Sequence, residues 1–349
     1  MNSIERFYAT VARKPVDRPA AWLGMPDILA QKSLFAEYEV SDLDALKKAV
    51  DDDFYAVEVP YHATNADAIY AAFDWYGDGV VDSHDRTLTS AGCFQDAETQ
   101  ADIADFAWPN PQQNISPDAC RRNVDMVPDG KVALGILWSA HFQDTCAAFG
   151  MENALVNMLT NPDIYKAVDN KIVEFYLQAN QIFFEATKHR LNAVLIGNDL
   201  GSQRGLMLSP ELVREFIIPG AKRLIAQAHS YGLKVIYHSC GSIDAIIPDL
   251  IAAGVDVIHP IQALATGMDP RSLQERFGET VSFCGGVDTQ ELLVHGSTED
   301  VKNKVRELRT IFRTGLILSP SHEAILPDVP PENIRALFEE AKKAYDAQS

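Results

Sequence analysis

The chain has 349 residues, of which 47% are hydrophobic and 23% charged, ordinary values for a globular protein. No segment approaches the roughly 18 consecutive apolar residues of a membrane-spanning helix, so we expect no membrane association. The formal net charge of -19 at pH 7 would repel a phosphate backbone, and no Lys/Arg-rich stripe reverses it locally. Composition therefore argues against membrane proteins and against nucleic-acid binding.

The first residues, Met1 to Phe7, include charged side chains and lack an apolar stretch with a cleavage site, so no secretory signal is predicted. We therefore expect a cytoplasmic protein, in which cysteines stay reduced. An odd number of cysteines at irregular spacing indicates metal binding, catalysis or burial rather than disulfides. The cysteines are Cys93, Cys120, Cys146, Cys240 and Cys284.

Short apolar runs rich in β-branched residues recur along the chain and, from about residue 130 onward, alternate with longer helical stretches. This alternation is typical of βαβ units and a parallel sheet. The runs lie at residues 19–24, 53–59, 131–138, 192–199, 234–240, 255–260, 280–286 and 315–320. Eight such strands predict a (β/α)8 TIM barrel that spans residues 1–349 as a single domain.

The stretch between the second and third runs predicts a small insertion at the barrel entrance. Residues 79–84 (GVVDSH) and 87–94 (TLTSAGCF) indicate a hairpin or strand pair, and residues 108–117 (WPNPQQNISP) indicate an irregular connection. Elsewhere, Ser209, which precedes a proline, and Pro331, which follows one, mark helix starts.

Polar side chains gather at the ends of the predicted strands, where the active sites of such barrels form. Asp199 ends the fourth run, His238 and Cys240 end the fifth, His259 lies near the end of the sixth, Cys284 lies in the seventh, and His322 and Glu323 follow the eighth. Because the carboxyl ends of all the strands meet at one face of a barrel, we expect these residues to converge there.

His238 and Cys240 are two residues apart, so on an extended strand both point to the same side. Imidazole and thiolate are preferred ligands of zinc, and a catalytic zinc site holds three protein ligands and one open position. His322 and Cys284 are both candidates for the third ligand, and we rank His322 slightly ahead. A short His-x-Cys pattern also occurs by chance, and Cys284 equally fits a small core residue.

Three further residues are predicted to be catalytic. Asp199 follows a buried strand, where a carboxylate would orient a ligand or act as a base, although it would also suit a helix entry. His259 precedes a proline, and a role in the pocket and a hydrogen bond to the next loop are equally consistent with its position. Glu323, with Tyr237 and Gln262, is a candidate for the pocket wall.

The sequence resembles the uroporphyrinogen decarboxylase superfamily over nearly its whole length. Residues 198–243 resemble the central segment of that superfamily, residues 259–293 and 321–345 the segments that follow, and residues 5–22 its opening. Porphyrin decarboxylases of the family carry an arginine-rich R-Q-A-G-R opening after the first strand to hold substrate carboxylates. Here residues 23–27 read Leu-Gly-Met-Pro-Asp, which lacks that cationic clamp.

The motif His238-Ser239-Cys240 is similar to the His-x-Cys mark of the methyltransferase branch, which includes methylcobamide:coenzyme M methyltransferases. In the coenzyme M enzymes a later cysteine after the eighth strand completes the zinc site, and His322 stands at that place here. The chain also lacks the corrinoid motif Asp-x-His-x-x-Gly, because the nearest match, residues 82–87, ends without glycine. The resemblance therefore implies a corrinoid supplied by a separate corrinoid-binding protein.

Together these features predict a zinc-dependent methyltransferase. It would move a methyl group between a small O-, N- or S-methyl compound, or a thiol, and the cobalt of a corrinoid protein. One alternative is a cofactor-free decarboxylase, in which Asp199 stabilises a protonated intermediate while His238 and Cys240 merely pack. Another is a zinc-binding accessory protein that docks a corrinoid protein without turnover.

Overall fold

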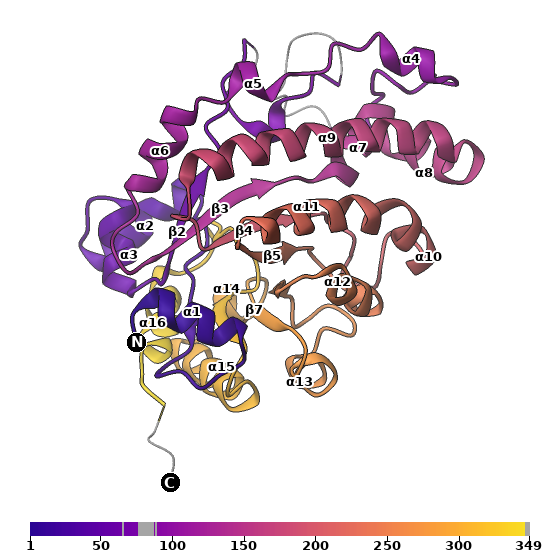
Figure 1. Cartoon of the computed structure of the whole chain (residues 1–349). Helices are drawn as coiled ribbons and strands as arrows, with labels where there is room; N and C mark the ends of the chain where they lie inside the picture. Colours follow the sequence, from indigo (N-terminus) through magenta and orange to yellow (C-terminus); the bar gives the residue numbers. More distant parts are fainter. Residues whose placement is uncertain (65, 76–86, 88, 346–349) are drawn as a thin grey trace.

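The computed structural model describes residues 1–64, 66–75, 87 and 89–345, and it contains all eight predicted strands in one curled parallel sheet (Figure 1). The strand order is β1-β8-β7-β6-β5-β4-β3-β2. The strands are β1 (Ala20–Ala21), β2 (Phe54–Glu58), β3 (Val132–Trp138), β4 (Ala193–Gly197), β5 (Lys234–His238), β6 (Val257–Ile261), β7 (Ser282–Val287) and β8 (Leu316–Pro320). The predicted (β/α)8 barrel is confirmed.

The strands are mostly apolar because they are covered on both faces, except that β2 exposes Ala56 and Glu58. On β3, Leu134 and Ile136 pack into the barrel interior, while Ala133 and Leu137 belong to the larger core between the sheet and the helices. Successive side chains of a strand point to opposite faces, which produces this division. The alternation also fixes which polar residues at the strand ends point into the barrel opening.

The barrel closes between β1 and β2 without a strand ladder, and we call this junction the seam. In the described part of the chain, β1 pairs only with β8. Asp53, just before β2, donates its backbone N–H to the Ala21 carbonyl at 3.0 Å and accepts the Ala21 N–H on its carboxylate at 2.9 Å. The same buried carboxylate accepts hydrogen bonds from Arg6 at 2.6 Å and Arg18 at 2.9 Å. The Asp53 side chain and the two arginines therefore join β1 to β2 and complete the barrel at the seam.

Helices surround the sheet, and their starts agree with the sequence signals. Ser209 caps its helix by accepting the Leu212 N–H, and the last helix begins at Pro331, as predicted. The α-helices are α1 (Ser3–Val11), α2 (Ile28–Tyr38), α3 (Leu43–Val50), α4 (Gln100–Ala104), α5 (Pro111–Asn114), α6 (Pro117–Asp125), α7 (His141–Phe149), α8 (Met151–Thr160), α9 (Pro162–Thr187), α10 (Pro210–Leu212), α11 (Ile218–Ser230), α12 (Ile247–Ala253), α13 (Pro270–Phe277), α14 (Leu292–His295), α15 (Thr298–Ile311) and α16 (Pro331–Ala341).

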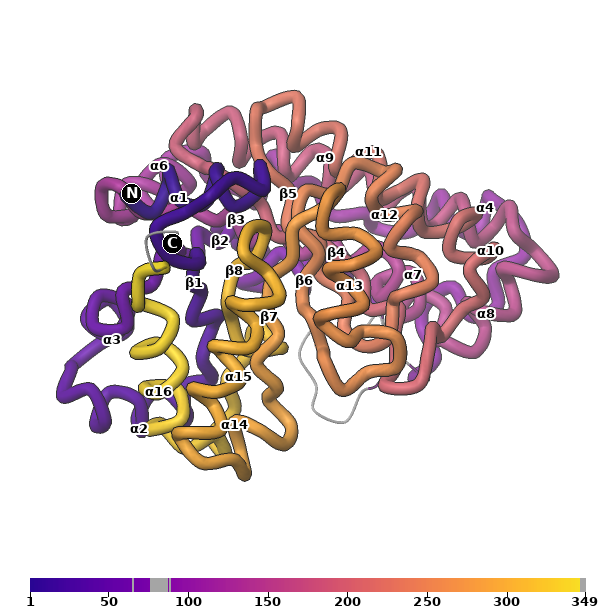
Figure 2. Tube along the Cα trace, turned by 90° about the horizontal axis from the view of Figure 1, so that it is seen from below, coloured from indigo at the N-terminus to yellow at the C-terminus, as the bar shows by residue number. Residues whose placement is uncertain are grey.

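The two ends of the chain pack together, since α16 contacts α2 and α3, as Figure 2 shows. On the opposite side the long helix α9 lies between the sheet and the insertion that carries α4, α5 and α6 (Figure 1). Among the helices of the described residues, none has the length and apolar character needed to cross a membrane.

The insertion differs from its prediction. Residues 79–84 lie outside the described residues, whereas residues 89–94 form turns rather than a strand. Their backbone hydrogen bonds reach other segments, from Cys93 N–H to the Trp75 carbonyl and from Phe94 N–H to the Ala148 carbonyl. The predicted irregular connection at 108–117 instead contains α5 and the first residue of α6, since Asn110 and Ser116 each cap a helix that starts with proline.

Candidate metal centre

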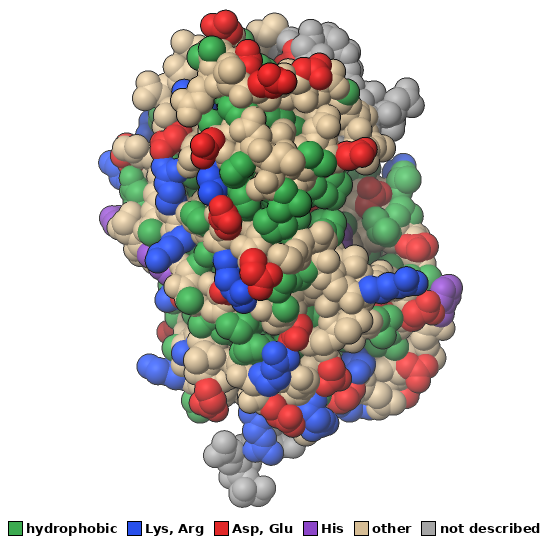
Figure 3. Space-filling view, turned by 90° about the vertical axis from the view of Figure 1, so that its right-hand side faces the viewer, with side chains coloured by type: hydrophobic (Ala, Val, Ile, Leu, Met, Phe, Trp, Pro, Cys, Tyr) green, Lys and Arg blue, Asp and Glu red, His purple; other side chains and the backbone are tan. Residues whose placement is uncertain are grey.

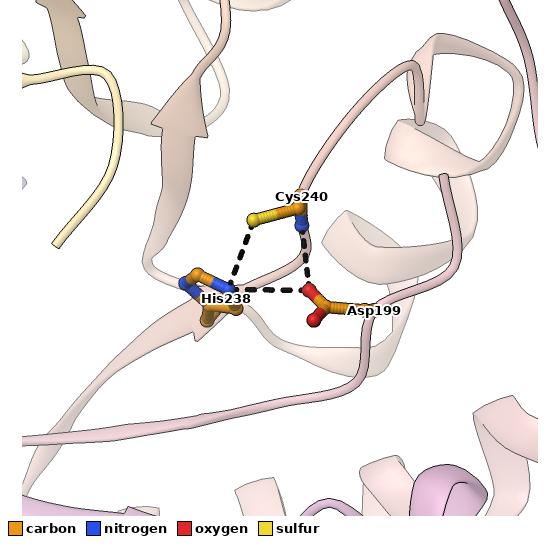
Figure 4. A group of neighbouring side chains, drawn as sticks. All are labelled: Asp199, His238 and Cys240. Atoms are coloured by element: carbon orange, nitrogen blue, oxygen red, sulfur yellow. Dashed lines mark hydrogen bonds and ion pairs between the residues drawn. The ribbon is translucent and has the colours of Figure 1, made fainter. Parts of the chain in front are cut away.

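Three predicted residues meet at the carboxyl end of the strands, which we call the mouth (Figure 4). His238 ends β5, Cys240 follows it by two residues, and Asp199 follows the end of β4 by two. The His238 Nε2 atom lies 3.4 Å from the Cys240 Sγ atom and 3.2 Å from the Asp199 Oδ1 atom. Asp199 Oδ1 also accepts the backbone N–H of Cys240 at 2.9 Å. The two βα loops thus present three potential metal ligands to one point.

These spacings fit a tetrahedral zinc ion. With Zn–N and Zn–O distances of about 2.0 Å and a Zn–S distance of about 2.3 Å, neighbouring donors lie about 3.3 to 3.5 Å apart. The separations of His238 from Cys240 and from Asp199 agree with these values to within about 0.2 Å. Imidazole, thiolate and carboxylate are also the donor types that zinc accepts.

The loop after β8 brings His322 and Glu323 to the same place. The His322 side chain lies near enough to the Cys240 thiol to lower the pKa of that thiol, and its ring is 6.3 Å from the His238 ring, centroid to centroid. Glu323 Oε2 lies between the two imidazoles, 3.5 Å from His238 Nδ1 and 3.6 Å from His322 Nδ1. His322 is therefore positioned as a further donor beside the three-residue group.

The far side of His238 contacts His259 from β6. The two Nδ1 atoms are 2.9 Å apart, so one ring donates an N–H hydrogen bond and the other ring accepts it. His259 is fully buried, and its Nε2 atom has no hydrogen-bond partner. If His238 binds a metal through Nε2, its Nδ1 carries the proton and His259 is the acceptor, with Glu323 close by.

The local electrostatics favour the metal-binding forms of Cys240 and Asp199. Burial works to lower the pKa of His238, but its hydrogen bonds to Asp199 and Cys240 raise that pKa overall, so a metal ion must displace a proton from this ring. Burial works to raise the pKa of Cys240, but hydrogen bonds from His238 and His322 outweigh it and lower that pKa, which favours thiolate. Burial likewise opposes ionisation of Asp199, yet its hydrogen bonds to His238 and Cys240 hold its pKa at about 2. Burial and the neighbouring histidines keep the pKa of His259 well below its ordinary value, so this ring is neutral.

Cys284, the other candidate for a third ligand, lies elsewhere. Its side chain is fully buried in the apolar interior of the barrel, and burial raises the pKa of its thiol. It pairs with Ile317 in the middle of β7, three residues before that strand ends at Val287. It therefore sits below the mouth, and the structure favours His322 over Cys284.

Several residues hold the ligand loops in place. Asn198 accepts the Phe142 N–H and donates to the Tyr237 hydroxyl, which joins β4, β5 and the start of α7. Gln262 accepts the backbone N–H of Gly241, next to Cys240. Tyr237 and Gln262 thus support the ligand loops, whereas the sequence suggested them for the pocket wall.

Sequence reasoning missed Trp138 as a residue of the site. It ends β3 with φ at +52°, a conformation that bulky residues rarely adopt. Its ring lies 5.5 Å from the His238 ring, nearly perpendicular to it. The signal was present in the sequence, because Trp138 ends its predicted strand just as His238 nearly ends its own.

The fold and these donors define a (β/α)8-barrel protein with a candidate metal site at its mouth. The chain belongs to the uroporphyrinogen decarboxylase (URO-D) family, which matches residues 93–344. It is 22% identical over 316 residues to the Methylated-thiol--coenzyme M methyltransferase of Methanosarcina mazei, covering 88% of this chain and 75% of that relative. A solved methyltransferase from Methanosarcina mazei shares the fold with a TM-score of 0.70 and 16% identity, over 98% of each chain.

Proposed function

We propose that this protein is a zinc-dependent methyltransferase that exchanges a methyl group between a small methyl compound or thiol and a separate corrinoid protein. Membership of the URO-D family and the similarity to methyltransferases support methyl transfer in general. The observation that carries the proposal is the distance of His238 Nε2 from Cys240 Sγ and from Asp199 Oδ1, since these two distances match edges of a zinc tetrahedron.

In this proposal His238, Cys240 and Asp199 hold the ion, and His322 lies beside Cys240 as the nearest additional donor. Bound zinc supplies Lewis acidity toward the heteroatom of the methyl compound, or lowers the pKa of a thiol. The ligand set retains the predicted His238 and Cys240 and gives Asp199, predicted as a catalytic carboxylate, a direct role.

The remaining residues orient the ligands. His259 accepts the proton on Nδ1 of His238, which leaves Nε2 free to bind, and its full burial keeps water from competing for that contact. Glu323 Oε2 lies 3.5 Å from His238 Nδ1 and 3.6 Å from His322 Nδ1 without a hydrogen bond of its own, so it can take up a proton released from a thiol. The corrinoid is assigned to a partner protein, since the sequence lacks a motif of its own for that cofactor.

Zinc content tests the proposal. We expect close to one zinc per chain in the wild-type protein, and loss of most of it in His238→Ala and Cys240→Ala. Asp199→Ala and His322→Ala, measured in parallel, identify the third ligand. Cys284→Ala is the matched control, because it also removes a thiol from the barrel yet should keep the metal. A wild-type protein that holds no zinc after reconstitution under reducing conditions would contradict the proposal and favour a metal-free decarboxylase.

A further inference from the structure

The loops around the mouth carry many acidic side chains and almost no basic ones. We compare the loops that follow β1 and β3 to β8, at residues 22–27, 139–140, 198–209, 239–243, 262–269, 288–291 and 321–330. Their acidic side chains are Asp27, Asp199, Asp269, Asp288, Glu291, Glu323 and Asp328. The same loops contain one Lys or Arg, which is the exposed Arg204.

The loop after β2 continues this pattern. Its described part before α4 contains Asp67, Asp74, Asp96 and Glu98 and no Lys or Arg. Figure 3 views the side of the molecule toward which β3 points in Figure 1. A shaded hollow to the right of the centre of this face is bordered by hydrophobic side chains, with an acidic side chain among them.

The carboxylates at the centre of the mouth also lack cationic partners other than histidine. Asp199 and Glu323 form their ion pairs with His238 and His322, and no ion pair joins either carboxylate to a described Lys or Arg. A divalent ion held by His238, Cys240 thiolate and Asp199 would therefore be neutralised by its own ligands, and Glu323 would add one further negative charge.

Trp138 adds a surface that suits a cation. Its ring is only half-buried, is held 5.5 Å from the His238 ring, and belongs to a residue whose backbone is fixed in the left-handed region. The face of an indole ring attracts cations through its quadrupole and offers nothing to an anion. The ring and the carboxylates thus favour the same kind of ligand.

We propose, on the basis of the proposed function, that the small-molecule substrate of this site is uncharged or cationic, and that anionic methyl compounds or thiols are rejected. In the metal-loaded site the ion balances the charge of Asp199, so an anion entering the mouth would meet the uncompensated Glu323 carboxylate, whose side chain is mostly buried and where screening by salt is weak. Arg204 is the described residue of these loops that could reverse this preference, and it is exposed.

The test compares three thiols of matched length in the cobalt(II)-substituted protein. They are 2-mercaptoethanesulfonate, which is an anion, 2-mercaptoethanol, which is neutral, and 2-aminoethanethiol, which is a cation at pH 7. Binding is followed by the thiolate-to-cobalt absorption band. We expect the neutral and cationic thiols to bind at least tenfold more tightly than the sulfonate, and Glu323→Gln to narrow the gap.

Arg204→Ala is the control, because it should leave all three affinities unchanged. Tightest binding by the sulfonate would overturn the inference, as would sulfonate binding that is lost in Arg204→Ala. A metal-loaded protein that binds none of the three thiols would also contradict it. Failure to retain any metal would instead overturn the zinc site of the proposed function, so the two failures can be told apart.

Discussion

The two ends of the barrel treat buried charge in opposite ways. At the amino-terminal end of the strands, the buried Asp53 carboxylate has Arg6, Arg18 and a backbone N–H as partners. On the mouth side, Asp144 in the first turn of α7 is also buried, but its hydrogen bonds come from the neutral Tyr176 hydroxyl at 2.6 Å and Trp75 indole at 3.4 Å. One end pairs its buried carboxylate with arginines, whereas at the other end Asp144, Asp199 and Glu323 form no ion pair with a described Lys or Arg.

This contrast separates the charged residues that stabilise the fold from those that are kept for the chemistry of the site. Compensated buried charges cost little as long as both partners are present, and they fix the geometry of the seam. Uncompensated carboxylates and histidines are costly to the folded state, and proteins keep such groups chiefly where chemistry requires them. Three substitutions test this reading, from the largest expected effect to the smallest.

Asp53→Asn should be the most destabilising. It removes the buried negative charge that two buried arginines share, so that Arg6 keeps only Asp17 and Arg18 keeps only Asp51, whose carboxylates are partly exposed. Breaking a buried ion pair in this way lowers the free energy of unfolding by about 3 to 5 kcal/mol. Urea denaturation measures the loss. The matched control is Asp51→Asn, whose partly exposed carboxylate also pairs with Arg18 and should cost no more than about 1 kcal/mol. Equal effects of the two changes would contradict the comparison.

Asp144→Asn should remove a pH dependence of stability. Burial raises the pKa of Asp144 to about 7, whereas in the unfolded chain it ionises near its ordinary value. Between those two pKa values the folded state alone keeps the proton, so this group's contribution to stability is present at low pH and is lost as pH rises toward 7. The total loss is about 4 kcal/mol at most.

The difference in unfolding free energy between wild type and Asp144→Asn should therefore shift in favour of the variant from pH 5 to pH 8. Both proteins share all other titrating groups, so the pH dependence that those groups give to the unfolding free energy cancels in the difference. Urea unfolding of both proteins at the two pH values measures it. A difference that is the same at both would show that Asp144 is ionised throughout.

Gly197→Ala should have a smaller effect on stability but a direct one on the site. A Cβ atom at Gly197 would lie 1.9 Å from the His238 carbonyl oxygen, so the backbone of β5 must move. We expect a loss of about 1 to 3 kcal/mol and weaker zinc binding. Gly205→Ala, in the loop that follows β4, meets no atom within 4 Å and serves as the control. Full zinc content and affinity in Gly197→Ala would argue against the ligand geometry proposed here.

The sequence predicted the strands well because each is a short, mostly apolar run, and every strand but β2 is buried on both faces. Every strand agrees with its predicted run to within a few residues, even β1, which has only two residues in the ladder. The ends of β4, β5 and β8 carried Asp199, His238 and Glu323 to one point because parallel strands must end at the same face.

The parts of the fold and the site that were not predicted depend on contacts between residues far apart in the sequence, which no local pattern encodes. Cys284 fitted the metal set by residue type, yet its depth in the barrel depends on where β7 ends, and that strand continues to Val287. The contact of Asp144 with Trp75 joins residues 69 positions apart across the insertion. Likewise, the support that Asn198 gives to Tyr237 becomes evident only once β4 and β5 lie side by side.

The pairing of β1 has a consequence for how the protein is made. The ladder partner of Ala20 is Ile317, so the first strand finds its neighbour only when the last strand exists. During synthesis, residues 19–24 must wait for almost the entire chain to leave the ribosome, although β2 to β7 can pair in order as they emerge. Contacts so distant in sequence slow folding, and the ladder between β1 and β8 becomes the last to form, whereas the contacts of Asp53 with Arg6 and Ala21 join residues only 47 and 32 positions apart. A chain truncated before β8 would therefore expose an unpaired strand at each edge of its sheet.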